Sequence, residues 1–347
     1  MSIFRRTAQI LLIALAIVAM LFDVFVLIAS RVNNVLLVFS STVAIIATGV
    51  FVVMLFQLSF LERKSFFVAI VGFAESGKTT LIISLFGEAY ARRLPVRVVP
   101  RGSHTIAVIN KSLELLKKGK ALGPTTDQDM YGFRADATIG KGPFATTYRL
   151  EFGDFPGAYS KEYRREDMHL LHNSEFFKWI VDSDAIMFVI DLGRYLTRNK
   201  RNFIAEVTSA FRTEWQQYLD ANSFRLREIK RHPVIIVFTK TDLLYRVSSQ
   251  INLQNDKELS DIENLRNFEE TVAHFGFGED APPLIKLDEK RVQSDTHIIE
   301  EEFGEIIQFF KAEASSATVV FTSSFGLVNG ELLGFRKLFA SILKDAK

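Results

Sequence analysis

The residue types best suited to chemistry are Gly72, Gly77, Lys78 and Thr79, which follow the G-x-x-x-x-G-K-[ST] spacing of a phosphate-binding loop. An apolar run of strand length precedes the loop, and apolar residues spaced at helical intervals follow it. In that context, backbone N–H groups curl around a phosphate and the helix N-terminus favours its charge. Lys78 is expected to reach the outer phosphates, and the Thr79 hydroxyl to hold Mg²⁺. A glycine-rich turn beside a surface lysine is the alternative.

The loop residues expected to contact the ligand are consecutive apart from one position. They are Gly72, Ala74, Glu75, Ser76, Gly77, Lys78, Thr79 and Thr80.

Four further polar stretches follow the loop in the chain. Pro-Thr-Thr-Asp at 124–127 lies in a loop, whereas Asp-Phe-Pro-Gly at 154–157, Thr-Lys-Thr-Asp at 239–242 and Thr-Ser-Ser at 322–324 each end an expected strand. Because ligands gather at the carboxyl ends of parallel strands, we expect these stretches to surround one site with the phosphate loop.

With these five motifs in this order, the chain resembles the Ras-like, TRAFAC-class P-loop GTPases over about residues 65–345. The resemblance implies that Thr125 completes Mg²⁺ coordination and senses the γ-phosphate. It also implies that Asp154 holds Mg²⁺ through water and that the Gly157 N–H contacts the γ-phosphate. The membrane anchor inferred below and the proline of the second stretch are similar to the signal-recognition-particle receptor β subunit of the Arf group, and to uncharacterised bacterial membrane-associated GTPases.

The resemblance also implies how the base is held. Thr239, Lys240 and Asp242 are similar to Asn-Lys-x-Asp, with Thr in place of Asn, and Ser323 with Ser324 resembles the Ser-Ala pair that supports the guanine carbonyl. The residues assigned to catalysis are Lys78, Thr125 and Gly157, and those assigned to Mg²⁺ are Thr79, Thr125 and Asp154.

A physical argument for guanine stands beside the resemblance. The Asp242 carboxylate can accept two hydrogen bonds at once, from N1–H and from the exocyclic amine of guanine. Adenine offers neither donor there, and a site built on buried polar groups rejects a ligand that leaves them unpaired. GTP or GDP, with Mg²⁺, is therefore the predicted ligand.

Two positions depart from the pattern of fast GTPases. GTP hydrolysis needs a group that orients the attacking water, commonly a glutamine directly after the glycine of the stretch at 154–157. This chain has Ala158 at that position. Ala74 stands where small GTPases with good intrinsic activity carry glycine. Slow hydrolysis assisted by a partner is expected. In the mixed-charge run 160–166, Glu162 could orient the water and Arg164 could act as an arginine finger in cis. The alternative is that this run is only a solvated helix start.

Composition excludes several other classes of protein. Lys plus Arg number 42 against 40 Asp plus Glu, so no global field favours a nucleic-acid partner. Cysteine is absent, which excludes disulfides, thiolate zinc sites and cysteine nucleophiles.

The first 64 residues differ in composition from the rest. Residues 10–29, interrupted by Asp23, and residues 35–56 are each about the 20 apolar residues needed to cross a bilayer. Basic residues flank both outer ends, which favours a two-helix hairpin, in the membrane over residues 8–60, with both termini in the cytoplasm. A cleaved signal peptide would explain the first stretch but not the second.

From residue 65 onward, strand-like and helix-like segments alternate, which predicts an α/β fold with a doubly wound, mainly parallel sheet. Residues 133–153 are expected to form a hairpin that turns at 140–143 and places one antiparallel strand at the sheet edge. Helices are also expected at about 258–275, 296–314 and 331–343. The predicted domains are a transmembrane hairpin anchor over 1–64 and a P-loop GTPase domain over 65–347, with helical insertions at about 103–120 and 255–317.

Three functions are compatible with these features. The first is a membrane-anchored GTP-binding switch that hydrolyses GTP slowly and acts on a cytosolic effector, or waits for an activator. The second is a GTP-bound receptor or scaffold subunit with little or no hydrolysis, which Ala74 and Ala158 favour. The third is an ATP-dependent enzyme on the same fold, which Asp242 disfavours.

Overall fold

The computed structural model describes residues 48–49, 64–73, 75–94, 96–123, 131–139, 146–154, 181–226, 230–246 and 280–344. The chain divides into two compact units, Met1–Arg63 and Lys64–Lys347, and the description below concerns the second. Among the described residues, no helix has the length and apolar character needed to span a bilayer. The two expected spans lie outside those residues except at 48–49, so the hairpin and the domain division stay predictions.

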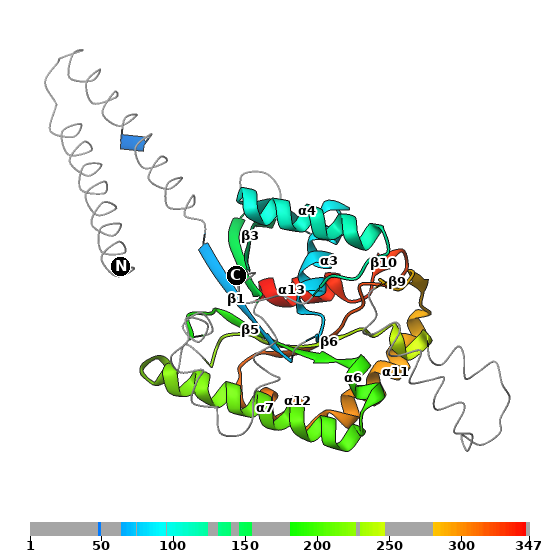
Figure 1. Ribbon diagram of the computed structural model, residues 1–347. Helices are drawn as coiled ribbons and strands as arrows, with labels where there is room; N and C mark the ends of the chain where they lie inside the picture. Colours follow the sequence, from blue (N-terminus) through cyan, green and yellow to red (C-terminus); the bar gives the residue numbers. More distant parts are fainter. Residues whose placement is uncertain are drawn as a thin grey trace, which may run out of the picture. The chain divides into compact units, whose positions relative to one another are not determined.

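The second unit is built on a seven-stranded sheet with the order β2-β3-β4-β1-β5-β6-β8 (Figure 1). Its strands are β1 (Lys64–Gly72), β2 (Arg97–Arg101), β3 (Tyr131–Ile139), β4 (Thr146–Asp154), β5 (Ala185–Asp191), β6 (Val234–Thr239) and β8 (Ala317–Phe321). A smaller sheet joins β7 (Ile285–Lys286), β9 (Gly326–Val328) and β10 (Glu331–Leu332).

Pairing in the large sheet confirms the expected mostly parallel arrangement with an antiparallel edge. Strands β4, β1, β5, β6 and β8 run parallel, whereas β3 pairs antiparallel with β4. The sequence did not predict β2, which adds outside β3 and is antiparallel to it. Its five residues include Pro100, and proline fits an edge strand because it removes a ladder donor.

Helices cover both faces of this sheet (Figure 1). They are α3 (Lys78–Tyr90), α4 (Ser103–Lys117), α6 (Leu192–Thr197), α7 (Lys200–Ala221), α11 (Glu289–Glu302), α12 (Gly304–Glu313) and α13 (Phe335–Lys344), with the 3-10 turn η5 (Ser223–Arg225). One core lies under α3 and α13 and includes Phe86 and Phe133. The other lies under α7 and α12, where Phe188 packs against Phe211 and Phe310. The central strands are therefore packed on both faces, and this packing positions the strand ends.

The structure differs from the sequence expectation near the C-terminus. A single helix expected over 296–314 is two helices that meet at Phe303, and a helix expected from residue 331 begins only at Phe335. The second difference has a steric cause. Gly334 has φ +81, and a Cβ there would lie 1.9 Å from the Phe321 carbonyl oxygen, so the chain turns sharply before α13. The helix expected around 258–275 and the turn expected at 140–143 lie outside the described residues.

Candidate nucleotide-binding site

The phosphate loop leaves the buried strand β1 and enters α3, as its sequence context predicts. Gly72 is required by space, because a Cβ there would lie 2.8 Å from the Val189 carbonyl oxygen of β5. Glu75 and Gly77 have φ of 60 and 84, so the loop turns through left-handed conformations before the helix begins. This path brings the loop backbone against the carboxyl end of the sheet.

Lys78 is buried at the start of α3, and its ammonium group folds back into the loop. Nζ donates to the carbonyl oxygens of Gly72 at 2.8 Å and Phe73 at 2.7 Å. The Ser76 hydroxyl is buried and has no hydrogen-bond partner among the residues that the structure describes. An orphaned buried hydroxyl beside a held ammonium is typical of a polar site that a ligand or water completes.

The end of β6 contacts the phosphate loop directly. The Thr239 hydroxyl donates to the Ser76 carbonyl at 2.7 Å and lies 3.2 Å from that of Ile190. Lys240, with φ 57, extends its Nζ to the Glu75 carbonyl at 3.1 Å. Residues 239 and 240 therefore support the backbone of a loop more than 160 positions earlier in the chain.

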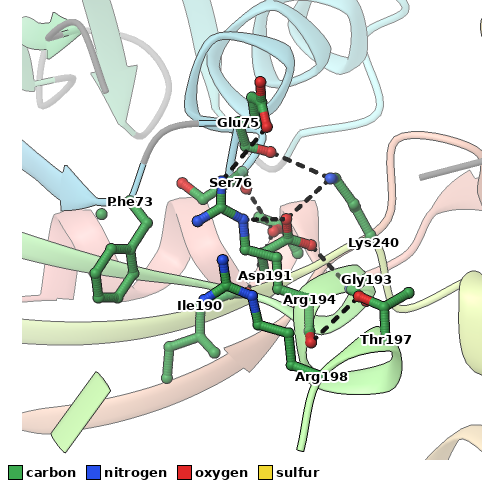
Figure 2. A network of polar contacts seen from close by, with 12 residues as sticks. Phe73, Glu75, Ser76, Ile190, Asp191, Gly193, Arg194, Thr197, Arg198 and Lys240 are labelled. Carbon is green, nitrogen blue, oxygen red and sulfur yellow. Dashed lines mark hydrogen bonds and ion pairs between the residues drawn. The ribbon is translucent and has the colours of Figure 1, made fainter. Parts of the chain in front are cut away.

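A network of charged groups continues from Lys240 (Figure 2). Its Nζ donates to Asp191 at 3.0 Å, and the buried Asp191 carboxylate also accepts from the Gly193 N–H at 2.8 Å as the N-cap of α6. Arg194 lies 3.9 Å from Asp191 and 3.4 Å from the Glu75 carboxylate. The network fixes Lys240 on one side and the exposed Glu75 side chain on the other.

Behind this network, Tyr195 of α6 donates to Glu302 of α11. Burial, followed by that hydrogen bond, raises the pKa of the Tyr195 hydroxyl, so it remains a donor throughout the physiological range. The contact ties α6, and with it the Asp191 cap, to α11.

Asp242 is buried and held by two donors. The Ser323 hydroxyl donates to Oδ1 at 2.6 Å, and Arg246 Nε donates to Oδ2 at 2.8 Å. Ser323 follows β8 and is buried, while Ser324 beside it is partly exposed. The structure thus brings together the two expected base-recognition motifs, from the ends of β6 and β8.

The remaining predicted residues are placed less fully. Thr79 and Thr80 are partly buried in the first turn of α3, and Asp154 is the last residue of β4, the strand beside β1. The Asp154 side chain and residues 74, 125 and 157 lie outside what the structure describes. A hydroxyl and a carboxylate are hard oxygen donors of the kind that Mg²⁺ prefers, so the chemistry of Thr79 and Asp154 fits the ion.

The sequence analysis missed three residues of the site. Asp191 is the last residue of the wholly buried strand β5, and a carboxylate at a strand end is the signal that identified Asp154 and, just beyond β6, Asp242. Arg194 and Arg246 carried a weaker signal, since basic residues three or four positions after a carboxylate are common on exposed helices.

Comparisons with known proteins agree with this geometry. The family model described as 50S ribosome-binding GTPase matches residues 67–240, half of the chain. Among curated proteins, none matches this chain.

Solved structures give weaker likenesses. The RocCORdC fragment of Roco2 from Methanosarcina barkeri, bound to GDP, is 14% identical with a TM-score of 0.29, over 81% of this chain and 50% of that one. The GTPase-like domain of Ski7 from S. cerevisiae, bound to GTP, is 14% identical with a TM-score of 0.32, over 78% and 44%. This chain therefore spans half or less of the length of those structures.

The phosphate loop, its supports at the end of β6 and the Asp242–Ser323 contact occupy the carboxyl edge of a mostly parallel sheet. With the match over residues 67–240, they show that the chain belongs to the 50S ribosome-binding GTPase family of P-loop GTPases.

Proposed function

We propose that this chain is a membrane-anchored GTP-binding protein that hydrolyses GTP slowly and acts as a nucleotide-dependent switch for a cytosolic partner. The observation that carries the nucleotide part is the convergence of Lys78, Thr239 and Asp242 at the carboxyl edge of the large sheet. The phosphate end and the base end of one nucleotide would then lie on two motifs that the Thr239–Ser76 hydrogen bond joins.

Each group has a role in the bound state. Lys78 would exchange its two carbonyl partners for phosphate oxygens, because a charge-assisted bond to an anion is stronger than one to a neutral carbonyl. Asp242 would accept from N1–H and the 2-amino group of guanine, with Ser323 and Ser324 beside the guanine carbonyl. The Lys240 stem would lie along the base plane.

Thr79, Thr125 and Asp154 would hold Mg²⁺. The ion would neutralise charge that develops on the phosphate oxygens. Gly157 would present its N–H to the γ-phosphate, and with Thr125 it would change position between nucleotide states.

Ala158 is the reason to expect slow turnover, since a methyl group cannot orient a water molecule. A partner would supply the missing group, or Glu162 or Arg164 would. The same residue supports the alternative, a receptor or scaffold subunit that holds GTP with little or no hydrolysis. Single-turnover hydrolysis by the full chain, with and without cell extract, divides the two: acceleration by extract supports the switch.

Membrane anchoring rests on the composition of residues 8–60 and places both termini and the GTPase domain on the cytoplasmic side. A grouping near the signal-recognition-particle receptor β subunit, or near bacterial membrane-associated GTPases, belongs to the same proposal. Retention of the full chain in membranes after alkaline carbonate extraction is the expected result, and release into the supernatant would contradict it.

Competition against a fluorescent GDP analogue on the full chain tests the nucleotide part. GDP should displace the analogue and equimolar ATP should not. Asp242→Asn should weaken GDP by about two orders of magnitude or more, because two charge-assisted hydrogen bonds are lost. The same variant should gain affinity for XDP, whose 2-oxo group accepts from the new amide. Displacement by ATP would refute the guanine assignment.

A further inference from the structure

Asp242 and Arg246 form an ion pair inside the base end of the site. A helical turn begins at Asp242, whose carbonyl accepts from the Arg246 N–H at 3.0 Å, so the two side chains lie on one face. Arg246 Nε lies 2.8 Å from Asp242 Oδ2, and the side chains are only 6% and 3% exposed. A pair this deeply buried requires further hydrogen bonds to offset desolvation.

Ser323 and Arg246 donate to different oxygens of the Asp242 carboxylate. An ionised carboxylate offers about four lone-pair sites on its two oxygens. Ser323 takes one on Oδ1 and Arg246 takes one on Oδ2, which leaves one site on each oxygen. Two adjacent acceptors are what the N1–H and 2-amino donors of guanine require. Arg246 therefore does not compete with the base.

What Arg246 changes is the orientation of the carboxylate. The terminal torsion of an aspartate side chain is broad, so a single donor on Oδ1 leaves the plane of the group free to turn. A second donor on Oδ2 fixes that plane. The geometry is then set before a base arrives, which reduces the ordering cost of binding.

Arg246 is itself held from a distant part of the chain. One of its terminal nitrogens donates to the Pro283 carbonyl, and the segment after Pro283 joins the loop behind β8 through a bond from the Ile285 N–H to the Phe325 carbonyl. Only a planar guanidinium offers separate donors in a rigid fork to both Asp242 and Pro283. A lysine carries its donors on one atom at the end of a flexible stem, so it would not fix the plane of the carboxylate in the same way.

We infer that Arg246 is a positioning residue for purine selection: it orients the Asp242 carboxylate toward the N1–H and 2-amino edge of guanine. The inference rests on the proposed function and deepens it. Arg246 does not touch the base, so its effect should appear in the choice between bases rather than in phosphate binding.

The readout is the ratio of GDP to IDP affinity, because IDP differs from GDP only in lacking the 2-amino group. In the full chain, Arg246→Gln should lower this ratio about tenfold, the scale of one charge-assisted hydrogen bond. Arg246→Lys should keep the charge and restore part of the ratio. Arg336→Gln, which removes an exposed pair with Glu331, should leave the ratio unchanged.

Three outcomes are informative. If both Arg246 variants weaken GDP and IDP by the same factor, Arg246 is only structural and the inference is overturned. If the wild-type chain does not prefer GDP to IDP, Asp242 does not recognise the 2-amino group as the proposed function states. The inference about Arg246 then fails as well. Removing one partner of a buried pair is strongly destabilising. If Arg246→Gln does not fold, a reduced ratio for the folded Arg246→Lys chain supports the inference, and an unchanged one refutes it.

Discussion

The hydroxyl of Thr239 joins the base motif to the phosphate loop, and its removal should weaken nucleotide binding. Thr239→Val keeps the shape of the side chain and deletes only the donor to the Ser76 carbonyl at 2.7 Å. A buried hydrogen bond contributes about 1 kcal/mol, and a carbonyl left without its donor costs about 1–3 kcal/mol. We expect a loss of about 1–3 kcal/mol in unfolding free energy, and GDP affinity about tenfold lower, since about 1.4 kcal/mol corresponds to a factor of ten.

Thr296→Val is the matched control. Thr296 on α11 is partly buried, and its hydroxyl donates to the Val292 carbonyl at 2.7 Å within the same helix. Urea unfolding and GDP titration on both variants separate stability from binding. Thr296→Val should lose no more stability than Thr239→Val, and only Thr239→Val should lose affinity. Equal loss of GDP affinity in the two variants would refute the idea that Thr239 positions the phosphate loop.

Two further predictions concern space and charge. Gly72→Ala should lower the unfolding free energy by about 1–3 kcal/mol and weaken GDP binding, because the added Cβ would lie 2.8 Å from the Val189 carbonyl oxygen. The control Gly304→Ala, at a glycine with open space around it, should change neither quantity. Full GDP affinity in Gly72→Ala would contradict the reasoning. Burial raises the pKa of Glu214 on α7 from 4.5 to about 7, so the folded chain binds a proton that the unfolded chain releases, and stability falls as pH rises through that interval. In urea unfolding, Glu214→Gln should therefore gain stability over the wild type at pH 8, by at most about 3 kcal/mol, and little near pH 4.5, and an equal gain at both pH values would contradict the reasoning.

The fold was largely predictable because each central strand is a buried apolar run between helical segments. β5 and β6 are buried at every position, which is what a parallel strand covered on both faces requires. The sequence pattern did not predict β2, because this strand is short, contains Pro100 and alternates between exposed and buried residues. At the edge of a sheet such a segment is stabilised by its partner strand rather than by its own pattern.

The site was predictable where chemistry marks a strand end, and not where burial depends on distant segments. Asp242 and Ser323 were expected together because each follows a parallel strand, and their side chains do meet. Arg246 looks like an ordinary helix-surface residue until the segment around Pro283 is packed over it. No local pattern relates residue 246 to residue 283, so the sequence could not reveal that its guanidinium is buried.

The contacts among the motifs also bear on what the site does best. Thr239 and Lys240 donate to the carbonyls of Ser76 and Glu75, so the loop backbone is held by groups from outside the loop. A loop already held in position loses little conformational entropy when a phosphate binds, and preorganisation of this kind favours tight, slowly released ligands. The same contacts do nothing for an attacking water. We therefore expect slow nucleotide release, which is a separate expectation from the slow hydrolysis predicted from Ala158.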